Sequence, residues 1–309
     1  MNGELFDIMG WQAFGDWGTS RLRLFRVEDG CPRERCDGPG IGALDTAPET
    51  ILREALAGWR NQGDPDAIRL TGMVGSRNGW VEAPYVECPA DASGWARGAA
   101  RLDLDGIPVV IAAGLACTRP GGAHDVMRGE ETQIFGALRL HGPLADGRHL
   151  IALPGTHSKW AEVENGTITG FRTFFTGEMF ALLRDRSTLM RAGDMHASAD
   201  EEAAGFGDGL ARAAQDPSLL GTMFEARAAQ LRAGRTASWA LGFLSGLLIG
   251  NEIQAATNAA SAATRVCLIG DPRLVLRYER ALAGTGLSVN SLDGDACALA
   301  GLELLGSAA

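Results

Sequence analysis

Two short turns carry the residue types that proteins use to bind phosphate. The first reads Gly-Asp-Trp-Gly-Thr-Ser over residues 15–20, and the second reads Pro-Gly-Thr-His-Ser-Lys over residues 154–159. Backbone N–H groups and a hydroxyl in a Gly-Thr turn can hold an anion, and an adjacent ammonium adds a point charge. Lys159 is the single lysine among 28 basic residues, the rest being arginine. Arginine does not replace lysine at every site, so this position is a candidate for phosphate chemistry, although a chance survivor of arginine-rich usage would look the same.

The flanks of both turns predict β-hairpins. Residues 12–27 alternate around the first turn. The second turn lies between the apolar segments 150–153 and 160–163, and Asn165-Gly166 then favours a further hairpin turn. The two turns lie about half a chain apart. Two such hairpins, one in each of two lobes, would hold a polyphosphate between them.

Composition limits the classes of function. The 309 residues suffice for one large or two ordinary domains, and 46% hydrophobic content is typical of a globular protein. A net charge of −10 argues against a nucleic-acid or membrane-surface partner. The six cysteines show no metal-binding spacing, which favours free thiols in a reducing cytoplasm. We expect neither a signal peptide nor a membrane span, because the N-terminus lacks the required pattern and the apolar segment 239–250 is too short.

Helix and strand patterns alternate along the chain, which predicts an α/β fold with mixed sheets. Acidic residues precede an apolar helix near residue 130, and Thr176 is a candidate helix cap. Gly242, Gly246 and Gly250 recur every four residues, so their helix should pack closely on another element. Residues 193–218, rich in alanine, glycine and acids, are predicted to be irregular surface. Further elements are expected as helices at 48–60, 273–282 and 296–305 and as strands at 67–70, 107–113, 266–269 and 287–289.

Six segments of the chain form a recognisable series. They are Asp16-Trp17-Gly18-Thr19-Ser20, Gly72-Met73-Val74-Gly75-Ser76, Met127-Arg128-Gly129-Glu130-Glu131-Thr132-Gln133, Pro154-Gly155-Thr156-His157, Phe171-Arg172-Thr173 with Thr176-Gly177-Glu178, and residues 243–250. Together they resemble the 2-dehydro-3-deoxygalactonokinase family, within the superfamily of sugar kinases, chaperone ATPases and actin. The resemblance runs in order over nearly the whole chain, and the second and third segments are far more specific than the Gly-Thr turns. Gly15 and Phe175 depart from the pattern, yet neither removes a polar group that the chemistry needs.

The resemblance implies a two-lobed actin-like ATPase fold, a duplicated ribonuclease H-like arrangement with its active site in the cleft between the lobes. We expect an N-terminal lobe over residues 1–132, with the final helix at about 296–309 returning to it, and a C-terminal lobe over 133–295. The implied reaction is phosphorylation of 2-dehydro-3-deoxy-galactonate by ATP, with Mg²⁺, to the 6-phosphate in galactonate and galactose breakdown. A homo-oligomer is left open.

The resemblance also suggests roles for single residues. Asp16 would hold Mg²⁺ through water, unless it is only a turn aspartate bonded to its own backbone. A carboxylate at the start of the helix that crosses between lobes would deprotonate the acceptor hydroxyl. That position falls on Glu130 and Glu131, of which Glu131 is preferred; the alternative is that both only complement the helix dipole. Lys159 would support catalysis. Phosphate and nucleotide contacts are expected from Asp16, Gly18, Thr19, Ser20, Gly155, Thr156, His157, Ser158, Gly270 and Asp271.

The implied substrate carries a carboxylate, which a guanidinium can bind with two parallel hydrogen bonds. Arg21, Arg77 and Arg128 are the candidates, although each singly could be a surface or ion-pair arginine. The wider sugar-acid site would include Gly75, Ser76, Trp80 and Tyr85. Trp80 could equally pack in the core, and Gly270 with Asp271 could equally form a tight turn before a helix.

Three alternatives remain at this stage. A kinase for the epimer 2-dehydro-3-deoxy-gluconate would share every motif. The two substrates differ only in the direction of one hydroxyl group, and no motif reports that difference. A non-catalytic nucleotide or sugar sensor on the same fold would be expected to lose the carboxylates and to gain a DNA-binding segment. A chaperone-like or actin-like ATPase would be expected to carry extra subdomains.

Overall fold

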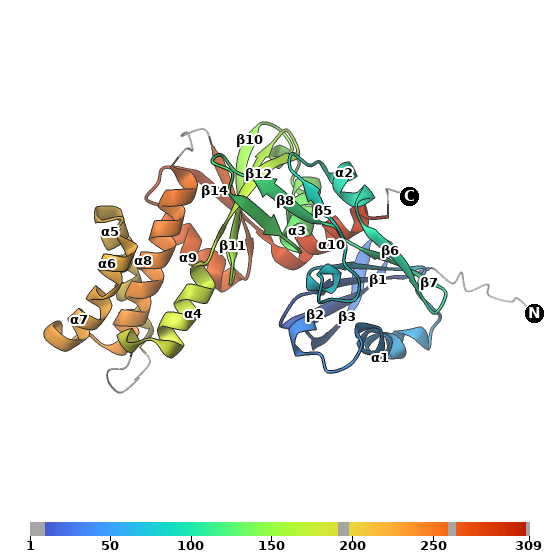
Figure 1. The fold of residues 1–309 in the computed structure, drawn as a ribbon, viewed down its shortest axis with the longest axis horizontal. Helices are drawn as coiled ribbons and strands as arrows, with labels where there is room; N and C mark the ends of the chain where they lie inside the picture. The colour runs from blue at the N-terminus through green and yellow to red at the C-terminus, as the bar shows by residue number, and fades with distance from the viewer. Residues whose placement is uncertain (1–9, 191–197, 259–263, 307–309) are drawn as a thin grey trace, which may run out of the picture. The chain divides into compact units, whose positions relative to one another are not determined.

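The computed structural model describes residues 10–190, 198–258 and 264–306. Packing divides the chain into two compact units. Unit 1 comprises Met1–Gly147, Val163–Phe171 and Gly294–Ala309, and unit 2 comprises Arg148–Glu162 and Arg172–Asp293. The chain therefore crosses between units several times, and each unit is built from segments distant in sequence (Figure 1).

Unit 1 is organised by a six-stranded sheet in the order β3-β2-β1-β4-β7-β6. The first three strands form an antiparallel meander, and β4 then joins β1 in parallel, followed by β7 in parallel and β6 antiparallel. A smaller sheet has the order β5-β8-β9. The strands are β1 Gln12–Trp17, β2 Arg21–Glu28, β3 Cys31–Pro39, β4 Ala67–Thr71, β5 Tyr85–Glu87, β6 Ala100–Leu104, β7 Ile107–Ile111, β8 Gly114–Thr118 and β9 His124–Met127.

The five-stranded sheet repeats the arrangement of the first sheet, in the order β12-β11-β10-β13-β14. Three consecutive strands lie side by side, and β13 then pairs in parallel with β10 and β14 with β13. Both predicted Gly-Thr hairpins are therefore present, each at the first turn of its meander. The strands are β10 Arg148–Leu153, β11 Ser158–Glu164, β12 Thr167–Phe174, β13 Arg265–Gly270 and β14 Ser288–Asp293.

The helices of unit 1 fix its boundary. Helix α3, Glu130–Leu140, packs against the last helix, α10, Gly294–Leu304. A Cβ on Gly301 would lie 2.0 Å from the Thr132 carbonyl oxygen, so the two backbones touch. The expected boundary at 132/133 stays a prediction; it falls inside α3, whereas unit 1 contains this helix whole and continues to Gly147. The other helices of this unit are α1 Pro48–Arg60 and α2 Ala92–Arg97.

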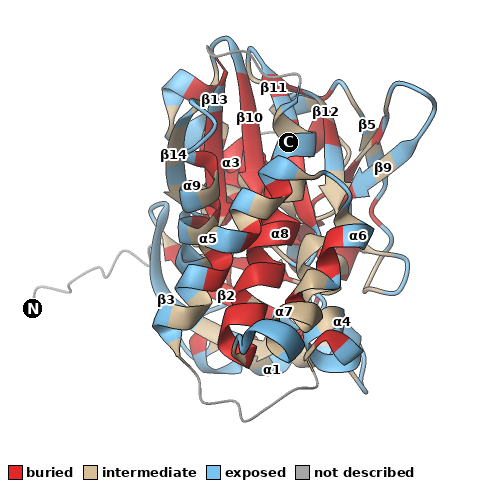
Figure 2. Cartoon of the chain, turned by 90° about the vertical axis from the view of Figure 1, so that its left-hand side faces the viewer, coloured by how far each residue is buried: buried red, intermediate tan, exposed pale blue. Residues whose placement is uncertain are grey.

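The helices of unit 2 surround the long apolar helix α8, which Figure 2 shows as an almost continuously buried element beside α5. The predicted close packing of α8 is confirmed, because a Cβ on Gly242 or Gly246 would lie 2.0 or 2.2 Å from a carbonyl oxygen of α5. The helices are α4 Thr176–Arg186, α5 Ala199–Gln215, α6 Leu219–Met223, α7 Glu225–Ala233, α8 Ala237–Thr257 and α9 Pro272–Leu282.

Two local expectations were wrong. Residues 199–215 form helix α5 instead of irregular surface, since their alanines and glycines allow the close approach of α8; residues 193–197 lie outside the described part. Thr176 is the first residue of α4 and not its cap, and Phe175 precedes it without a side-chain cap. No helix among the described residues is long and apolar enough to cross a membrane.

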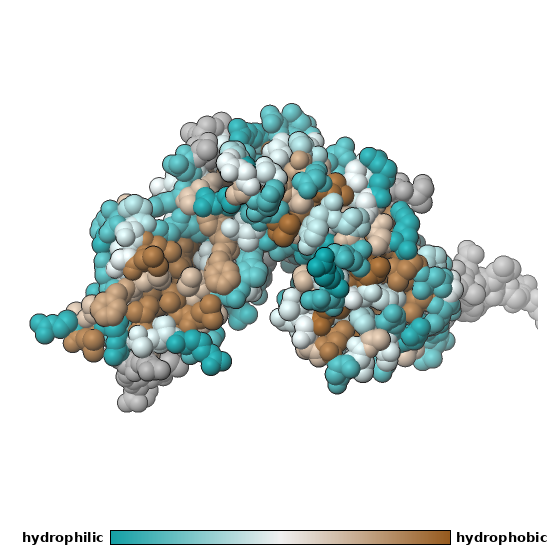
Figure 3. All heavy atoms as spheres, in the orientation of Figure 1, coloured by the Kyte–Doolittle hydropathy of each residue, from teal (hydrophilic) through white to brown (hydrophobic). Residues whose placement is uncertain are grey.

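Apolar side chains also reach the surface of unit 2. Figure 3 shows hydrophobic residues, coloured brown, gathered over its helices. The exposed large hydrophobic residues include Leu220 in α6, Phe224 at the C-terminal end of α6 and Leu231 in α7. Exposed apolar patches often mark contact surfaces. Self-association of the chain stays a prediction.

The glycine contact between α5 and α8 is testable by Gly242→Ala. The added methyl would meet the Glu202 carbonyl oxygen at 2.0 Å, so the helices must separate, and we expect the free energy of unfolding to fall by about 1–3 kcal/mol. Urea unfolding measures this change. The matched control is Gly58→Ala in α1, where a Cβ meets nothing within 4 Å and should stabilise by up to ~1 kcal/mol. Equal responses of the two variants would contradict the packing argument.

Candidate active site

The first Gly-Thr turn links β1 to β2. Gly18 N–H donates to the Arg21 carbonyl at 3.0 Å, and Thr19 and Ser20 are exposed at the tip. Gly42 N–H, in the segment that follows β3, donates to the Thr19 carbonyl at 2.9 Å and so fixes the turn. The hydroxyls of Thr19 and Ser20 can therefore reach a ligand. Arg21 follows directly, also exposed, at the first position of β2.

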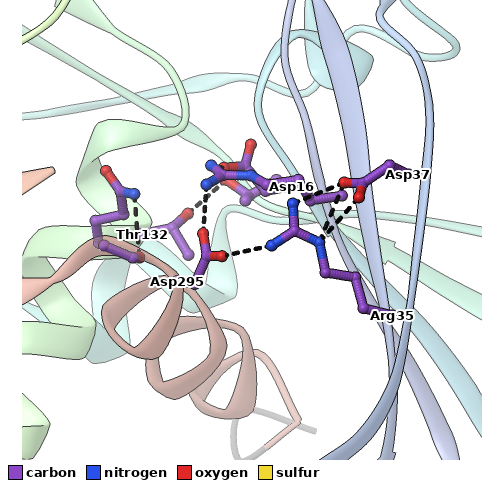
Figure 4. Close-up of polar contacts among 9 residues, drawn as sticks. Asp16, Arg35, Asp37, Thr132 and Asp295 are labelled. Carbon is purple, nitrogen blue, oxygen red and sulfur yellow. Dashed lines mark hydrogen bonds and ion pairs between the residues drawn. The ribbon is translucent and has the colours of Figure 1, made fainter. Parts of the chain in front are cut away.

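Asp16 belongs to a chain of alternating charges in unit 1 (Figure 4). Arg23, its partner across the β1–β2 ladder, forms ion pairs with both Asp16 and Asp295. Arg35 continues the chain, at 3.0 Å from Asp295 and 2.8 Å from Asp37. Asp16 and Arg23 are largely shielded from solvent, which strengthens their attraction relative to an exposed pair. The carboxylate of Asp16 is therefore held in one orientation.

Three backbone segments of unit 1 meet beside Asp16. Gly72, just after β4, has φ +94°, and a Cβ there would lie 2.8 Å from the Trp17 carbonyl and 3.3 Å from Asp16 Oδ1. Gly129, just before α3, has φ +106° and would place a Cβ 3.3 Å from Gly72 Cα. Thr71 and Thr132 share a hydrogen bond of 2.6 Å at the same junction. The ends of β1 and β4 and the start of α3 thus form one polar cluster.

The two adjacent glutamates of α3 differ in environment. Glu131 is fully buried, and its carboxylate accepts hydrogen bonds from Gly129 N–H at 2.7 and 2.9 Å and from the Thr132 hydroxyl at 3.2 Å. Glu130 is half-buried, and its carboxylate accepts from Arg128 N–H at 3.1 Å. Burial raises the pKa of Glu131 from 4.5 to about 8, and the neighbouring charge of Glu130 raises it further. The hydrogen bond from Gly129 N–H and the charge of Arg128 lower the pKa but do not cancel this rise.

The predicted sugar-acid residues are partly brought together. Arg128 donates from Nη2 to the Ala83 carbonyl at 2.8 Å, and its guanidinium lies 4.4 Å from the centroid of the Tyr85 ring. A Cβ on Gly75 would lie 3.1 Å from Arg128 Nη1. Arg128 Nε and Nη1 and Ser76 Oγ are shielded from solvent without a hydrogen-bond partner among the described residues. Such atoms mark a place where a polar ligand could bind.

The remaining two predicted residues lie differently. The side chain of Arg77 is 85% exposed and reaches Glu82 only at 3.9 Å. Trp80 packs against the core of unit 1.

The second Gly-Thr turn links β10 to β11 in unit 2 and is packed on α4. A Cβ on Gly177 would lie 2.3 Å from the Gly155 carbonyl, and Glu178 N–H donates to the Thr156 carbonyl at 2.9 Å. His157 is exposed, with its Nε2 2.5 Å from Glu178 Oε2. The first turn of α4 therefore supports the Gly-Thr turn directly.

The two residues after His157 are buried at the start of β11. Ser158 Oγ lies 3.0 Å from Tyr278 OH, and the Lys159 ammonium donates to Thr173 Oγ1 at 2.8 Å with the residue 6% exposed. Both side chains thus bind within unit 2 in this conformation.

A cavity of about 370 Å³ opens beside this turn within unit 2. Its walls combine backbone from the turn and from α4 with side chains of α4, α5, α8 and α9. Gly270 and Asp271 do not line it; Asp271 instead accepts from Arg273 N–H at 2.9 Å and so caps α9, which supplies part of the wall. The lining residues are Gly155, Thr176, Gly177, Phe180, Arg184, Glu202, Leu241, Ser245, Leu248, Ile249, Leu274, Arg277 and Tyr278.

Sequence reasoning missed several of these residues. Arg23 could have been found from the hairpin register, which puts it opposite Asp16. Glu252 of α8, which is buried and accepts a hydrogen bond from Tyr278 of the cavity wall, was detectable as the single charged residue inside an apolar helix. Asp295 and Arg277 gave no comparable signal, because their partners are distant in sequence.

Comparisons with known proteins bear on this arrangement. Residues 16–305 match the profile of the family described as 2-keto-3-deoxy-galactonokinase. The chain belongs to this family. A Rhizobium meliloti protein assigned as a 2-dehydro-3-deoxygalactonokinase is 40% identical, over 95% of this chain and 96% of its own. The 2-dehydro-3-deoxygalactonokinase of Escherichia coli is 34% identical, over the same shares of the two chains.

A solved structure agrees with the sequence comparison. The crystal structure of a Sinorhizobium meliloti protein, assigned to the same activity, has a TM-score of 0.85 at 36% identity and covers 96% of this chain and 98% of its own. The predicted α/β fold with mixed sheets is confirmed, and the chain forms two compact units. The chain is therefore a kinase of the 2-keto-3-deoxy-galactonokinase family, with a small sugar acid and ATP as its substrates.

The buried Glu131 predicts a pH-dependent stability. In the folded protein its carboxyl stays protonated up to about pH 8, whereas in the unfolded chain it ionises near 4.5. Between these values the unfolded state binds fewer protons, so wild-type stability should fall with rising pH by about 1.4 kcal/mol per unit relative to Glu131→Gln. Urea unfolding at pH 5, 6, 7 and 8 measures the difference. Glu130→Gln is the control. It removes a charge that raises the Glu131 pKa, so the pH range over which stability falls should become narrower. Parallel stability profiles for wild type and Glu131→Gln would contradict the assignment.

Proposed function

We propose that the protein transfers the γ-phosphoryl group of ATP to the terminal hydroxyl of 2-dehydro-3-deoxy-D-galactonate, giving the 6-phosphate in galactonate and galactose breakdown. The observation that carries the proposal is that each unit contains a Gly-Thr turn with a different feature beside it. Unit 2 contains a nucleoside-sized cavity beside one Gly-Thr turn, and unit 1 contains the polar cluster beside the other. Phosphoryl transfer asks a protein mainly for positioning and charge stabilisation, which these parts supply.

ATP is assigned to the unit 2 cavity. Leu274 and Leu248 supply apolar walls for the base, and Arg277 and Ser245 supply polar edges, with Arg277 Nη1 donating to Ser245 Oγ at 2.8 Å. The phosphates would extend toward the Gly155 end, where backbone N–H groups and Thr156 are available. Lys159 would add positive charge to the same turn, and Thr19 with Ser20 would bind the transferred phosphate from unit 1.

Magnesium is assigned to Asp16. Mg²⁺ in kinases is usually bound by one or two carboxylates together with phosphate oxygens and water, so a single oriented carboxylate fits this role. The described residues contain no cluster of three or more acidic, histidine or cysteine side chains that could bind a metal by itself. When bound, the ion would neutralise charge on the phosphates. Arg23 keeps the carboxylate aligned before the nucleotide arrives.

Glu131 is assigned as the general base and Glu130 as the group that tunes it. A general base works best with a pKa near the working pH, and about 8 is close to neutrality. The acceptor oxygen would attack the γ-phosphorus while its proton passes to Glu131 and the bond to ADP breaks. Because the Glu131 carboxylate is covered in this conformation, it must leave Gly129 N–H when the acceptor binds.

Arg128 is the preferred partner of the substrate carboxylate. Its guanidinium is oriented by the Ala83 carbonyl and the Tyr85 ring, and two of its nitrogen atoms have no partner among the described residues. An unpaired guanidinium that is shielded from water favours an incoming anion. Arg77 and Arg21 are exposed and lack such orientation, so we rank them below Arg128.

Release of ADP from Mg-ATP with a panel of acceptors tests the proposed reaction. Turnover with 2-dehydro-3-deoxy-galactonate should be well above that with its gluconate epimer, and simple hexoses should give none. Activity with the epimer alone would support a kinase but contradict the proposed substrate. A protein that binds ATP but turns over no acceptor would instead favour a sensor.

The base is tested by conservative variants. Glu131→Gln should lower kcat by about 10²-fold or more, because the acceptor proton has no recipient. Glu130→Gln should retain most activity and move the acidic limb of the kcat/KM profile to lower pH, since loss of the neighbouring charge lowers the Glu131 pKa. Steady-state kinetics from pH 5 to 9 measure both effects. A severe loss in Glu130→Gln with mild loss in Glu131→Gln would reverse the two roles.

A further inference from the structure

An acidic side chain lies in the interior of unit 2, close to the second Gly-Thr turn. Glu252 is 2% exposed and belongs to α8, whose neighbouring residues are largely apolar. Its Oε1 accepts from Trp160 Nε1 at 2.7 Å, and its Oε2 accepts from Tyr278 OH at 2.8 Å. A buried carboxylate is costly unless several donors compensate it, so this arrangement is held in place by its partners.

The partners of Glu252 come from each element that surrounds the turn. Trp160 belongs to β11, which leaves the turn, and Tyr278 belongs to α9. The Ser158 hydroxyl, at the start of β11, lies 3.0 Å from Tyr278 OH and so reaches the carboxylate through Tyr278. The Thr176 hydroxyl, at the start of α4, also hydrogen-bonds to the carboxylate. One carboxylate therefore joins α8, α9, β11 and α4 at a single point.

The contacts continue from Glu252 to the turn itself. Thr176 is followed by Gly177, which lies so close to the Gly155 carbonyl that a Cβ would be 2.3 Å away. Glu178 N–H then donates to the Thr156 carbonyl at 2.9 Å. Ser158 connects the other end of the turn to the same carboxylate. A change at Glu252 would therefore reach the turn from both of its ends.

We propose that Glu252 is a positioning residue for the phosphates of ATP, acting through Ser158 and Thr176 on the turn at Gly155 and Thr156. The proposal rests on the ATP site assigned above. Glu252 does not line the cavity assigned to the nucleotide. Its role is to fix the backbone that does, so its loss should affect the phosphates and spare the nucleoside.

The test is Glu252→Gln, which keeps the shape but replaces one acceptor oxygen with an NH₂ group. Trp160 N–H can only donate, so the NH₂ must face hydroxyl groups that currently donate to the carboxylate. We expect the Kd for Mg-ATP, measured by calorimetry, to rise about tenfold or more, while the Kd for adenosine stays within about twofold. The KM for the sugar acid should not change.

Two further variants separate this role from general destabilisation. Tyr278→Phe removes one donor to Glu252 and should shift ATP affinity in the same direction by a smaller factor. Thr222→Val removes a buried hydroxyl of α6 that bonds to the Ser218 carbonyl at 3.0 Å, away from the network. This variant should lower Tm while the affinities for Mg-ATP and for adenosine stay as in wild type.

Some outcomes would overturn the proposal. Unchanged ATP affinity in Glu252→Gln, or equal losses for ATP and adenosine, would show that Glu252 does not act through the phosphate turn. A wild-type protein that binds neither ligand would overturn both this role and the ATP site. A wild-type protein that binds ATP but phosphorylates no sugar acid would overturn only the proposed reaction, because the comparison of ATP with adenosine needs no acceptor.

Discussion

The polar cluster of unit 1 depends on the close approach of two backbones at Gly72 and Gly129. Both residues have positive φ, and a side chain on either one would meet the backbone of another segment. This contact brings the end of β4 to the start of α3 and so places Thr71 against Thr132. Asp16 lies beside Gly72 because β1 pairs with β4, which puts Asp16 opposite Thr71. These segments can approach so closely only because Gly72 and Gly129 carry no side chain.

Unit 2 uses the same device twice. At the Gly-Thr turn, Gly177 lets the first turn of α4 rest on the Gly155 carbonyl. Within the helical layer, glycines of α5 and α8 bring the two helices into backbone contact, which fixes the face of α8 that carries Glu252. Backbone contact leaves little freedom for sliding, because any shift opens a gap or makes a clash. The positions of the site residues are therefore set by helix and strand packing more than by their own side-chain contacts.

The sequence predicted the parts of this molecule that depend on local patterns. Both hairpins, the helices at α1, α3, α9 and α10, and the tight packing of α8 followed from alternation, acidic or proline starts and glycine spacing. It failed at α5, where alanine and glycine indicated an irregular segment. Alanine favours a helix, but the three glycines of α5 weaken it in isolation, and the helix is stabilised by its contact with α8. Propensity cannot report a partner more than twenty residues away.

The candidate residues divided along the same line. Asp16, Glu130, Glu131 and the Gly-Thr turns were identifiable because their chemistry lies within short strings. Arg128 could be named but not chosen over Arg77, since the difference lies in the Ala83 carbonyl and the Tyr85 ring. Ion pairs that join distant segments, such as that between Arg23 and Asp295, are properties of the tertiary fold.

Charge placement reconciles an acidic chain with anionic substrates. The net charge is −10, yet ATP and a sugar acid must both bind. Near Asp16, Arg23 and Arg35 are shared among three carboxylates, so most of the negative charge that would repel a phosphate is offset. Glu131 solves the same problem differently, since its raised pKa keeps it largely neutral at pH 7. A neutral carboxyl would not oppose the approach of the anions, and it becomes an effective base only as it loses its proton. In the proposed reaction, catalysis and binding would therefore place opposite demands on Glu131, and a pKa close to neutrality would satisfy both in part.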